Sequence, residues 1–328
     1  MIYKAFLNRQ EITGFPVKGK ETSEIWGGNV LLWKKETKSK GIFKFEYYQT
    51  VEFGVQGTEL NVNWGDGTSE YLGDKHRDVS LYSEDGNGYL KHTAEARRYI
   101  ATITGNIVNM KFGTMPNTKH YADGILRVLS PLPATCNKFY SSICNFLFYK
   151  CANLQSVPEN LFELVPDIES MAFTFCDTNL YSYPDTMFDY LPNLKEADSV
   201  FGGSTIENVS GKMFSKCAKL KKASSLFSGC EKLTNVEQGF LSTQKLNYFI
   251  GNFSRCKNLV KVGSDFLQNA DIKNAERGFE NEFFNCTNLR EAPNYYERYP
   301  NLESRKAQDC YYNCKRLSFY SSLPNDWK

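Results

Sequence analysis

Cysteine and histidine are the residues of this chain that could do chemistry, as nucleophiles, metal ligands or disulfide partners. All ten cysteines lie beyond position 135, and the histidines are His76, His92 and His120. No histidine has a metal-binding companion four residues later, and the cysteines form no CxxC pair, although Cys310 and Cys314 lie close together. Zinc sites in proteins normally show such spacings. The sequence therefore predicts neither a bound metal nor another cofactor.

A cysteine nucleophile and a disulfide framework are the alternatives that stay open. Burial in apolar surroundings raises the pKa of a thiol and weakens it as a nucleophile. A regular apolar stack would explain the cysteines without pairing, although counterparts in adjacent repeats would sit near bonding distance. The chain has no GxSxG, P-loop or nucleotide-binding glycine pattern. We therefore expect the protein not to be an enzyme.

An aromatic residue, a cysteine and a leucine recur at three-residue spacing, as in FSGCEKL at 227 and FSRCKNL at 253. The leading aromatics are Phe148, Phe173, Phe201, Phe227, Phe253, Phe283 and Tyr311. A second series has steps of 26, 26, 26, 26 and 30 residues and consists of Phe162, Phe188, Phe214, Phe240, Phe266 and Tyr296. Such a period is typical of a solenoid, in which each coil buries its apolar side against the next. We predict coils of 26 residues, each built from two similar halves.

The repeated residues should point inward, because Cys is small, apolar and often buried. The predicted repeat core contains Phe148, Cys151, Leu154, Cys176, Cys217, Cys230, Cys256, Cys286 and Cys314. Pieces such as LTNVE at 233 are strand-sized and partly β-branched, and PENLFELVP at 158 looks like a single helical turn. Each coil should then carry two short parallel strands joined by helical turns and bends.

This half-repeat resembles the BspA-like leucine-rich repeats of bacterial surface proteins, whose pattern is an aromatic, two residues, Cys, two residues, Leu and a short strand. The resemblance covers roughly residues 125–328. Ser204 replaces the expected Cys, Leu180 sits one residue late after Cys176, and about four residues are inserted between Phe266 and Phe283. The resemblance implies a non-catalytic surface for adhesion or recognition.

The segment before the repeats is of a different kind. ELNVNWGDGTSEYL at 59 has the alternation and the Gly-Asp-Gly turn of a hairpin, and KHTAEARRYIATITGNI at 91 supplies another strand. Together they resemble the polycystic-kidney-disease (PKD) type of immunoglobulin-like β-sandwich. The matching residues are Trp64, Gly65, Asp66, Gly67, Thr68, His92, Thr93 and Tyr99, with Ala94 where Tyr is expected. The resemblance implies a spacer domain. Asp66 could touch a cation, although a turn-forming role is favoured.

The first 35 residues read as three short strands, too few to bury a core alone. Their ending, IWGGNVLLW, resembles the short N-terminal modules of some phage tail and receptor-binding proteins. Lys34 to Lys40 reads as a charged linker. We therefore predict an N-terminal β-strand docking module at 1–38, a PKD/Ig-like sandwich at 39–120 and the solenoid at 121–328, a mixed β and α/β fold.

Composition narrows the classes of partner. The 328 residues include 41% hydrophobic and 23% charged residues, which is ordinary for a globular protein, and mean hydropathy is −0.47. No apolar run approaches the length of a membrane span, and the first residues lack the apolar core of a signal peptide. A formal net charge of +2 gives no general attraction to nucleic acid. We expect no nucleic-acid partner and no membrane insertion.

Several tyrosines do not occupy the repeat positions that are expected to point inward. They are our candidates for a binding face: Tyr149, Tyr181, Tyr183, Tyr248, Tyr295, Tyr299 and Tyr312. They could equally cover the surface of a narrow solenoid. The favoured hypothesis is a phage tail or receptor-binding protein, located in the virion, that docks on other tail proteins through its N-terminus. Its solenoid would contact a host cell-surface protein or glycan. The alternative is a bacterial surface or secreted adhesin, and a hydrolase on a repeat scaffold is third.

Overall fold

The computed structural model describes residues 41–75, 89–113, 124–138 and 144–328, together with the backbone of four short strands within residues 1–40. The chain forms two compact units, Met1–Lys40 and Gly41–Lys328. It is mostly strand and turn with very little helix, so the prediction of a β-rich fold is confirmed. His76, His120, the linker at residues 35–40 and the expected boundary at 120/121 lie outside the described residues.

The first unit contains two small antiparallel hairpins where we expected three strands. Strand β1 (Ala5–Leu7) pairs with β2 (Gln10–Ile12), and β3 (Glu24–Gly27) pairs with β4 (Val30–Lys34). The expected number of strands was wrong, because the structure describes four strands in this unit.

The second unit begins with an antiparallel sheet made of β5 (Gly41–Asn63), β6 (Ser69–Lys75), β7 (Tyr89–Lys111) and β8 (Ile125–Val128). The order is β6-β5-β7, and β8 lies off this path, paired with Phe45, Glu46 and Tyr47 near the start of β5. Strand β5 bends so far that Phe43 and Val62 both pair with Ile103 of β7. Gly105 permits this crossing, because its φ is 135° and a Cβ there would lie 2.7 Å from the carbonyl oxygen of Glu59.

The turn between β5 and β6 lies at the expected WGDGT sequence and is held by Asp66. Its carboxylate accepts hydrogen bonds from the backbone nitrogen of Thr68 at 2.8 Å and from the Thr68 hydroxyl at 2.6 Å. His92 Nε2 lies 2.7 Å from the other carboxylate oxygen, and the His92 ring stacks on Trp64 at 4.4 Å. Asp66 therefore has the turn-forming role that the sequence favours.

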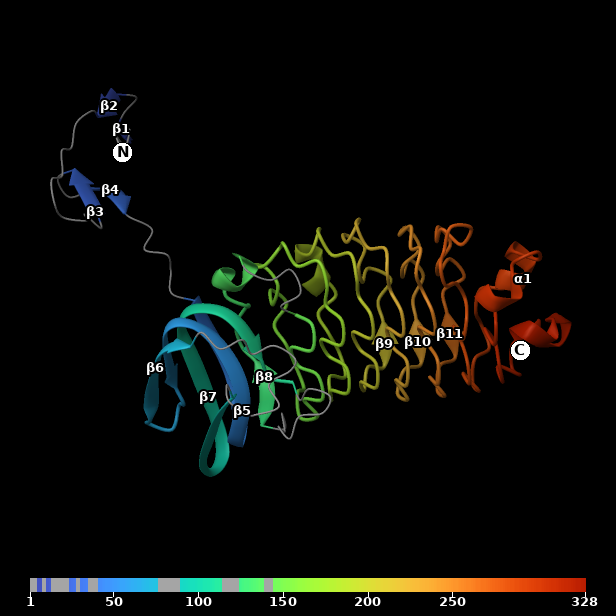
Figure 1. The fold of residues 1–328 in the computed structure, drawn as a ribbon, viewed down its shortest axis with the longest axis horizontal. Helices are drawn as coiled ribbons and strands as arrows, with labels where there is room; N and C mark the ends of the chain where they lie inside the picture. Colours follow the sequence, from blue (N-terminus) through green and yellow to red (C-terminus); the bar gives the residue numbers. More distant parts are fainter. Residues whose placement is uncertain are drawn as a thin grey trace. The chain divides into compact units, whose positions relative to one another are not determined.

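Residues 144–328 wind into a stack of coils, each coil being one full turn of the chain (Figure 1). One side of the stack carries the parallel strands β9 (Asn208–Val209), β10 (Asn235–Val236) and β11 (Lys261–Val262). A second row of parallel bridges joins successive coils through Ser170, Glu196, Lys222, Tyr248 and Arg277. Short parallel ladders on two sides therefore join neighbouring coils and position equivalent side chains at the same height.

Short helices occur mainly in and beyond the last coils. They are η1 (Ala134–Lys138), η2 (Met187–Tyr190), α1 (Tyr295–Arg298), η3 (Ser304–Lys306), η4 (Tyr320–Ser322) and η5 (Asn325–Trp327). Where a helical turn was expected, at residues 158–166, the structure has a run of hydrogen-bonded turns. In one of them the Leu161 nitrogen donates to the Pro158 carbonyl. In the described part of the chain, no helix has the length and apolar character required to cross a membrane.

Seven aromatic rings form a column inside the stack: Phe148, Phe175, Phe201, Phe227, Phe253, Phe283 and Tyr311. Neighbouring ring centroids are 5.5 to 5.9 Å apart with nearly parallel planes. We predicted Phe173 in this column, and that was wrong. Phe173 has a φ of 57° two residues before the column position, and Phe175 takes the inward place.

A column of small polar or sulfur side chains lies three residues after the aromatic column: Cys151, Thr178, Ser204, Cys230, Cys256, Cys286 and Cys314. The shift in phase at Phe175 means that Thr178, rather than Cys176, belongs to it. Cys176, predicted as a core member, is buried, but it directly follows the column ring and also lines a surface hollow. All ten cysteines are free thiols and all are buried. Cys217 lies in the other half of its coil, with its sulfur 3.5 Å from the carbonyl oxygen of Phe188.

The sheet and the stack share one hydrophobic core and belong to one compact unit, Gly41–Lys328. Phe112, at the end of β7, stacks on Phe148 with centroids 5.7 Å apart. The ammonium group of Lys111 donates a hydrogen bond to the carbonyl oxygen of Asn145. Strand β8, which follows the expected boundary, pairs with β5. The sheet therefore closes the first end of the stack.

Candidate functional site: a polar hollow on the coil stack

One five-residue segment of each coil has the same unusual backbone, and together these segments form what we call the turn ladder. The segments are residues 146–150, 173–177, 199–203, 225–229, 251–255, 281–285 and 309–313. The first and fifth residues of each have positive φ, for example 52° at Ser199 and 66° at Gly203. The backbone nitrogens of Ser199, Phe201 and Gly203 all donate to carbonyls of the next coil, at 2.7 to 2.9 Å. The turn ladder is therefore a fixed frame.

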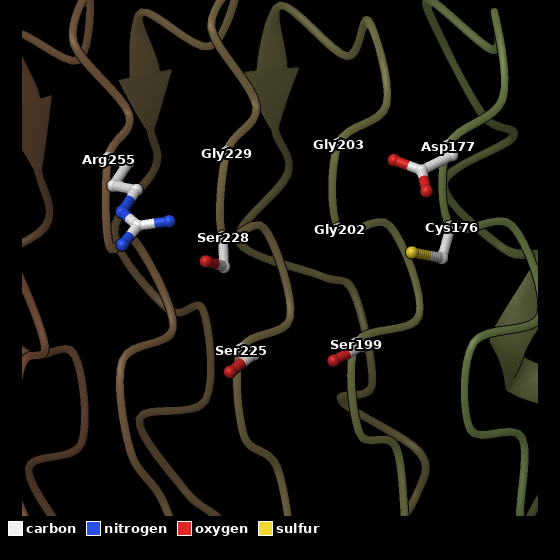
Figure 2. Close-up of a pocket in the computed structure, with 9 residues that line it drawn as sticks. All are labelled: Cys176, Asp177, Ser199, Gly202, Gly203, Ser225, Ser228, Gly229 and Arg255. Atoms are coloured by element: carbon white, nitrogen blue, oxygen red, sulfur yellow. The ribbon is translucent and has the colours of Figure 1, made fainter.

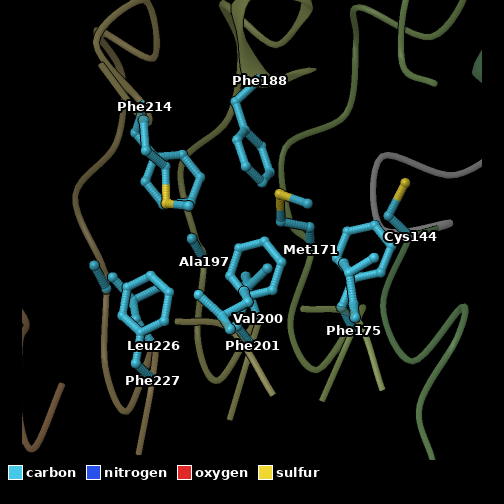
Figure 3. Close-up of a cluster of buried hydrophobic side chains, with 14 of the residues drawn as sticks. Cys144, Met171, Phe175, Phe188, Ala197, Val200, Phe201, Phe214, Leu226 and Phe227 are labelled. Atoms are coloured by element: carbon cyan, nitrogen blue, oxygen red, sulfur yellow. The ribbon is translucent and has the colours of Figure 1, made fainter. Parts of the chain in front are cut away.

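The third residue of each segment is the ring of the aromatic column, so the first, fourth and fifth positions form the outer surface. Beneath the middle of the turn ladder, Phe175, Phe201 and Phe227 lie side by side, and Phe188 and Phe214 form a second row (Figure 3). All five rings are fully or almost fully buried. Because a close-packed interior resists deformation, this layer gives the surface above it a rigid support.

The middle of the turn ladder is hollowed. An open depression of about 370 Å³ is lined by Cys176, Asp177, Ser199, Gly202, Gly203, Ser225, Ser228, Gly229 and Arg255 (Figure 2). It exists because Gly202, Gly203 and Gly229 have no side chains. In the outer coils the fourth position is Tyr149, Phe284 or Tyr312, and the fifth position is Lys150, Asn285 or Asn313. We call this depression the hollow.

The two ends of the hollow carry opposite charges. The Asp177 carboxylate lies over Gly203, where a Cβ on that glycine would be 2.1 Å from Oδ1, and the Arg255 guanidinium extends toward the hollow from the other side (Figure 2). Asp177 and Arg255 are both exposed. They lie three coils apart, which is about 14 Å at the usual spacing of paired strands.

The polar groups of the hollow are not used to hold the protein together. Within the described chain, the side chains of Asp177, Arg255, Ser199, Ser225 and Ser228 form no hydrogen bond or ion pair. Charged residues in the second row of parallel bridges do form ion pairs. There the Lys222 ammonium lies 2.9 Å from the Glu196 carboxylate of the preceding coil. The hollow therefore presents hydroxyl, carboxylate and guanidinium groups that are free to bind a ligand.

Aromatic surfaces flank the hollow on both sides along the turn ladder. On the first side, Phe146 and Phe173 stack with centroids 4.8 Å apart, Tyr149 packs edge-on at 5.5 Å from Phe146, and the Lys150 ammonium lies 5.2 Å from the Tyr149 ring. Each of these three rings is half-buried, so one surface of the group remains accessible.

On the other side, Phe284 and Tyr312 stack with centroids 4.8 Å apart, and Tyr312 is 43% exposed. We call the two groups the aromatic flanks. From Tyr149 to Tyr312 the ladder spans six coil steps, about 29 Å. A polar hollow between two aromatic flanks on a rigid frame is an arrangement suited to holding an elongated ligand.

The predicted tyrosines are not gathered on one face. Tyr149 and Tyr312 belong to the turn ladder and flank the hollow. Tyr248 is half-buried in the second row of parallel bridges, where it pairs with Lys222 on one side and Arg277 on the other. Tyr181 is 57% exposed but follows the turn ladder in its coil and does not line the hollow.

Three of the predicted tyrosines are held in the protein framework. The prediction of Tyr295 as a contact residue was wrong, because this residue is completely buried. Its ring stacks on Phe279 with centroids 3.8 Å apart, and its hydroxyl donates a hydrogen bond to the Phe266 carbonyl. Tyr183 packs its ring against the column, and its hydroxyl oxygen accepts a hydrogen bond from the Ser210 backbone nitrogen at 2.8 Å. The half-buried ring of Tyr299 lies 5.7 Å from Phe279.

The residues that build the hollow were missed by the sequence reasoning, although one signal for them is present. FGGS and FSGC at 201 and 227 place glycine where other coils have large side chains. Asp177, Arg255, Phe173 and Phe284 carry no such signal. To recognise these residues one must know which position of each coil points inward, because they become neighbours only after the coils stack.

The hollow offers polar contacts rather than an evident catalytic group. Burial raises the pKa of the Cys176 thiol to about 12, so the thiol remains protonated at neutral pH and is a poor nucleophile. Across the residues that the structure describes, no three His, Cys, Asp or Glu side chains are grouped so that they could hold a metal ion. His92 contacts Asp66 in the sheet and does not line the hollow.

No family model matches the sequence, and no curated protein matches it. One solved structure to which the chain is similar is the crystal structure of a TLR13–ssRNA13 complex, at 15% sequence identity and a TM-score of 0.20. The match covers 53% of this chain and 30% of the length of that chain. At this TM-score the likeness supports no statement about function.

Proposed function

We propose that this chain is a non-catalytic recognition protein that contacts the surface of a bacterial host through its coil stack. The observation that carries the proposal is the turn ladder, where unpaired polar groups lie between two aromatic flanks on a rigid frame. Aromatic side chains supply large contact areas and have few rotatable bonds to immobilise, which is why they dominate binding interfaces. In this proposal the stack is a leucine-rich-repeat solenoid of the BspA-like type.

The setting we propose is a phage tail or receptor-binding protein in a virion. The resemblance of IWGGNVLLW to N-terminal modules of tail proteins supports it, and this stretch forms β3 and β4. The first unit would dock on other virion proteins, and the bent sheet would be a PKD-like spacer. The alternative, a bacterial surface or secreted adhesin, is favoured by the resemblance of repeats such as FSRCKNL to those of bacterial surface proteins.

Binding of the labelled full-length chain to a panel of bacterial strains, measured by flow cytometry, tests this function. We expect saturable binding to some strains that weakens at least tenfold in the double variant Phe284→Ala and Tyr312→Ala, because loss of contact residues at this level is typical of aromatic anchors. Tyr181→Ala is the matched control, since Tyr181 is an exposed tyrosine outside the turn ladder.

Two results would contradict the proposal. The wild-type chain could bind no strain of a broad panel, or the control and the double variant could lose binding equally. Circular dichroism and thermal melting of each variant establish that the stack remains folded, so that a loss of binding is assigned to the surface.

A further inference from the structure

We propose that the hollow binds an acidic oligosaccharide, with the sugar chain lying along the stack across successive coils and a carboxylate group at Arg255. This inference rests on the proposed function, because it names the ligand class that the recognition surface would bind. It is argued from the charges at the two ends, the hydroxyls between them, the hydrogen bonds of the backbone beneath, and the aromatic flanks.

Arg255 and Asp177 determine the chemistry at the ends. A guanidinium group presents a planar set of donors that matches a carboxylate in two parallel hydrogen bonds. An ionised carboxylate such as that of Asp177 is an acceptor only, so its natural partners are hydroxyl and N–H donors. A sugar chain carrying carboxylate and hydroxyl groups satisfies both ends without placing like charges together.

The floor between the ends is suited to hydroxyl groups. The hydroxyls of Ser199, Ser225 and Ser228 each both donate and accept, as sugar hydroxyls do. Gly229 lets a ring approach the backbone closely, because a Cβ there would meet no atom nearer than 3.9 Å. The aromatic flanks would extend the site, because the electron-rich face of an aromatic ring attracts the positively polarised C–H groups on the face of a sugar.

The backbone of the turn ladder disfavours an extended peptide as the ligand. Peptides commonly bind open sheet edges by adding a strand, which requires free backbone groups. Here the nitrogen of Gly203 donates to Ser228 and the nitrogen of Gly229 donates to Ser254, both at 2.8 Å, so these groups are already paired between coils. The hollow also lacks the apolar pockets that anchor peptide side chains.

Gly202 offers a substitution that fills the hollow and should leave the fold intact. Its φ lies outside the left-handed region, and an added Cβ would meet its nearest atoms, Cys176 Sγ and backbone oxygens, at 3.5 to 3.6 Å. These are ordinary contacts. The equivalent fourth position in two other coils is Tyr149 or Tyr312, so the local backbone accepts tyrosine. Gly202→Tyr should therefore block the site by occupying it.

The experiment measures binding of the full chain to oligomers of galacturonic acid and to neutral galactose oligomers of equal length, by glycan array and calorimetry. We expect the acidic oligomers to bind at least tenfold more tightly. Arg255→Gln should abolish that preference and Arg255→Lys should retain part of it. Asp177→Asn should weaken binding of both oligomers, and Gly202→Tyr should abolish it. Arg316→Gln, an exposed arginine outside the turn ladder, is the control and should change nothing.

The outcomes separate this inference from the proposed function. Equal binding of acidic and neutral oligomers, or binding that survives Gly202→Tyr, overturns the inference. Binding of cells without binding of either oligomer, or binding of a peptide library that depends on Arg255, overturns the inference and leaves the recognition function standing. Binding of the acidic oligomers with no binding to any cell supports the inference and contradicts the proposed function.

Discussion

The thiol of Cys256 donates a hydrogen bond to the carbonyl oxygen of Phe227, one coil earlier, across 3.0 Å. The same contact joins Cys230 to Phe201 at 3.0 Å and Cys286 to Phe253 at 2.9 Å. Burial raises the pKa of the Cys230 thiol to about 12, so the proton needed for donation is present at neutral pH. Cysteine therefore supplies both a small apolar side chain and a donor for a buried carbonyl, which explains its repetition.

This contact predicts different effects for two substitutions at Cys256. Cys256→Ala should lower the free energy of unfolding by about 1–3 kcal/mol, because a buried carbonyl loses its donor and a small void remains. Cys256→Ser should cost less, since a hydroxyl can donate to the same carbonyl. Chemical denaturation of both variants measures the difference. If serine proved at least as damaging as alanine, the cysteine would be acting as apolar filling alone.

Glu282 is a buried acid in the same stack. It is completely buried, one carboxylate oxygen lies 3.3 Å from Asn252 Nδ2, and in the described structure the other oxygen has no hydrogen-bond partner. Burial raises the pKa of Glu282 from 4.5 to about 8, although the hydrogen bonds from Asn252 act in the opposite direction. The folded protein therefore keeps this proton at neutral pH, whereas the unfolded chain releases it.

This difference in pKa makes stability fall as pH rises. Because the unfolded state binds fewer protons between pH 4.5 and 8, the contribution is fully present below pH 4.5 and is lost progressively up to about pH 8. The free energy of unfolding should be about 3 kcal/mol lower at pH 7 than at pH 4 through this group. Glu282→Gln should remove that slope, as measured by denaturation at several pH values. A variant with the wild-type slope would show that Glu282 ionises freely in the fold.

Asp66 has the opposite effect on the pH dependence of stability. Its pKa is lowered from 3.8 to about 2, mainly by the hydroxyl hydrogen bond from Thr68, then by the Thr68 backbone nitrogen and by His92. Its contribution to stability is therefore present above pH 3.8 and lost as pH falls through 2. Thr68→Val should raise the pKa of Asp66 more than His92→Ala does, as followed by NMR titration of the Asp66 carboxyl. The reverse order would mean that the histidine, rather than the turn, holds the carboxylate.

The period of the stack could be predicted from the sequence because every coil must bury the same positions. Phe201, Phe227 and Phe253 occupy the column as expected. The second coil misled the prediction, because its FTFC sequence offers two phenylalanines and a cysteine at competing phases. Only the ring contacts with Phe148 and Phe201 select Phe175.

The hollow could not be predicted, since it is defined by missing side chains and by charges on different coils. Asp177 and Arg255 come together only through the stacking of four coils, and each alone resembles an ordinary surface residue. The tyrosines were a poor guide for a related reason. Tyr295 and Tyr183 carry hydroxyls whose buried partners, the Phe266 carbonyl and the Ser210 nitrogen, leave no trace in the local sequence.

The contact between the sheet and the first coil predicts where the chain can be cut. The Phe112 nitrogen donates to the Leu147 carbonyl at 2.9 Å, and the Phe112 ring covers Phe148, which is fully buried. Removing the sheet would expose Phe148, at a cost of about 1.5–3 kcal/mol, and would also free β8 from β5.

A fragment of residues 41–328 should therefore fold with the melting temperature of the full chain, because it retains the whole second unit. A fragment of residues 124–328 should melt about 10 °C lower, since it loses at least 3 kcal/mol of packing and strand pairing. Scanning calorimetry of both fragments measures this. Coil-to-coil contacts alone would be sufficient if the two melted at the same temperature, and the sheet would then be an independent domain.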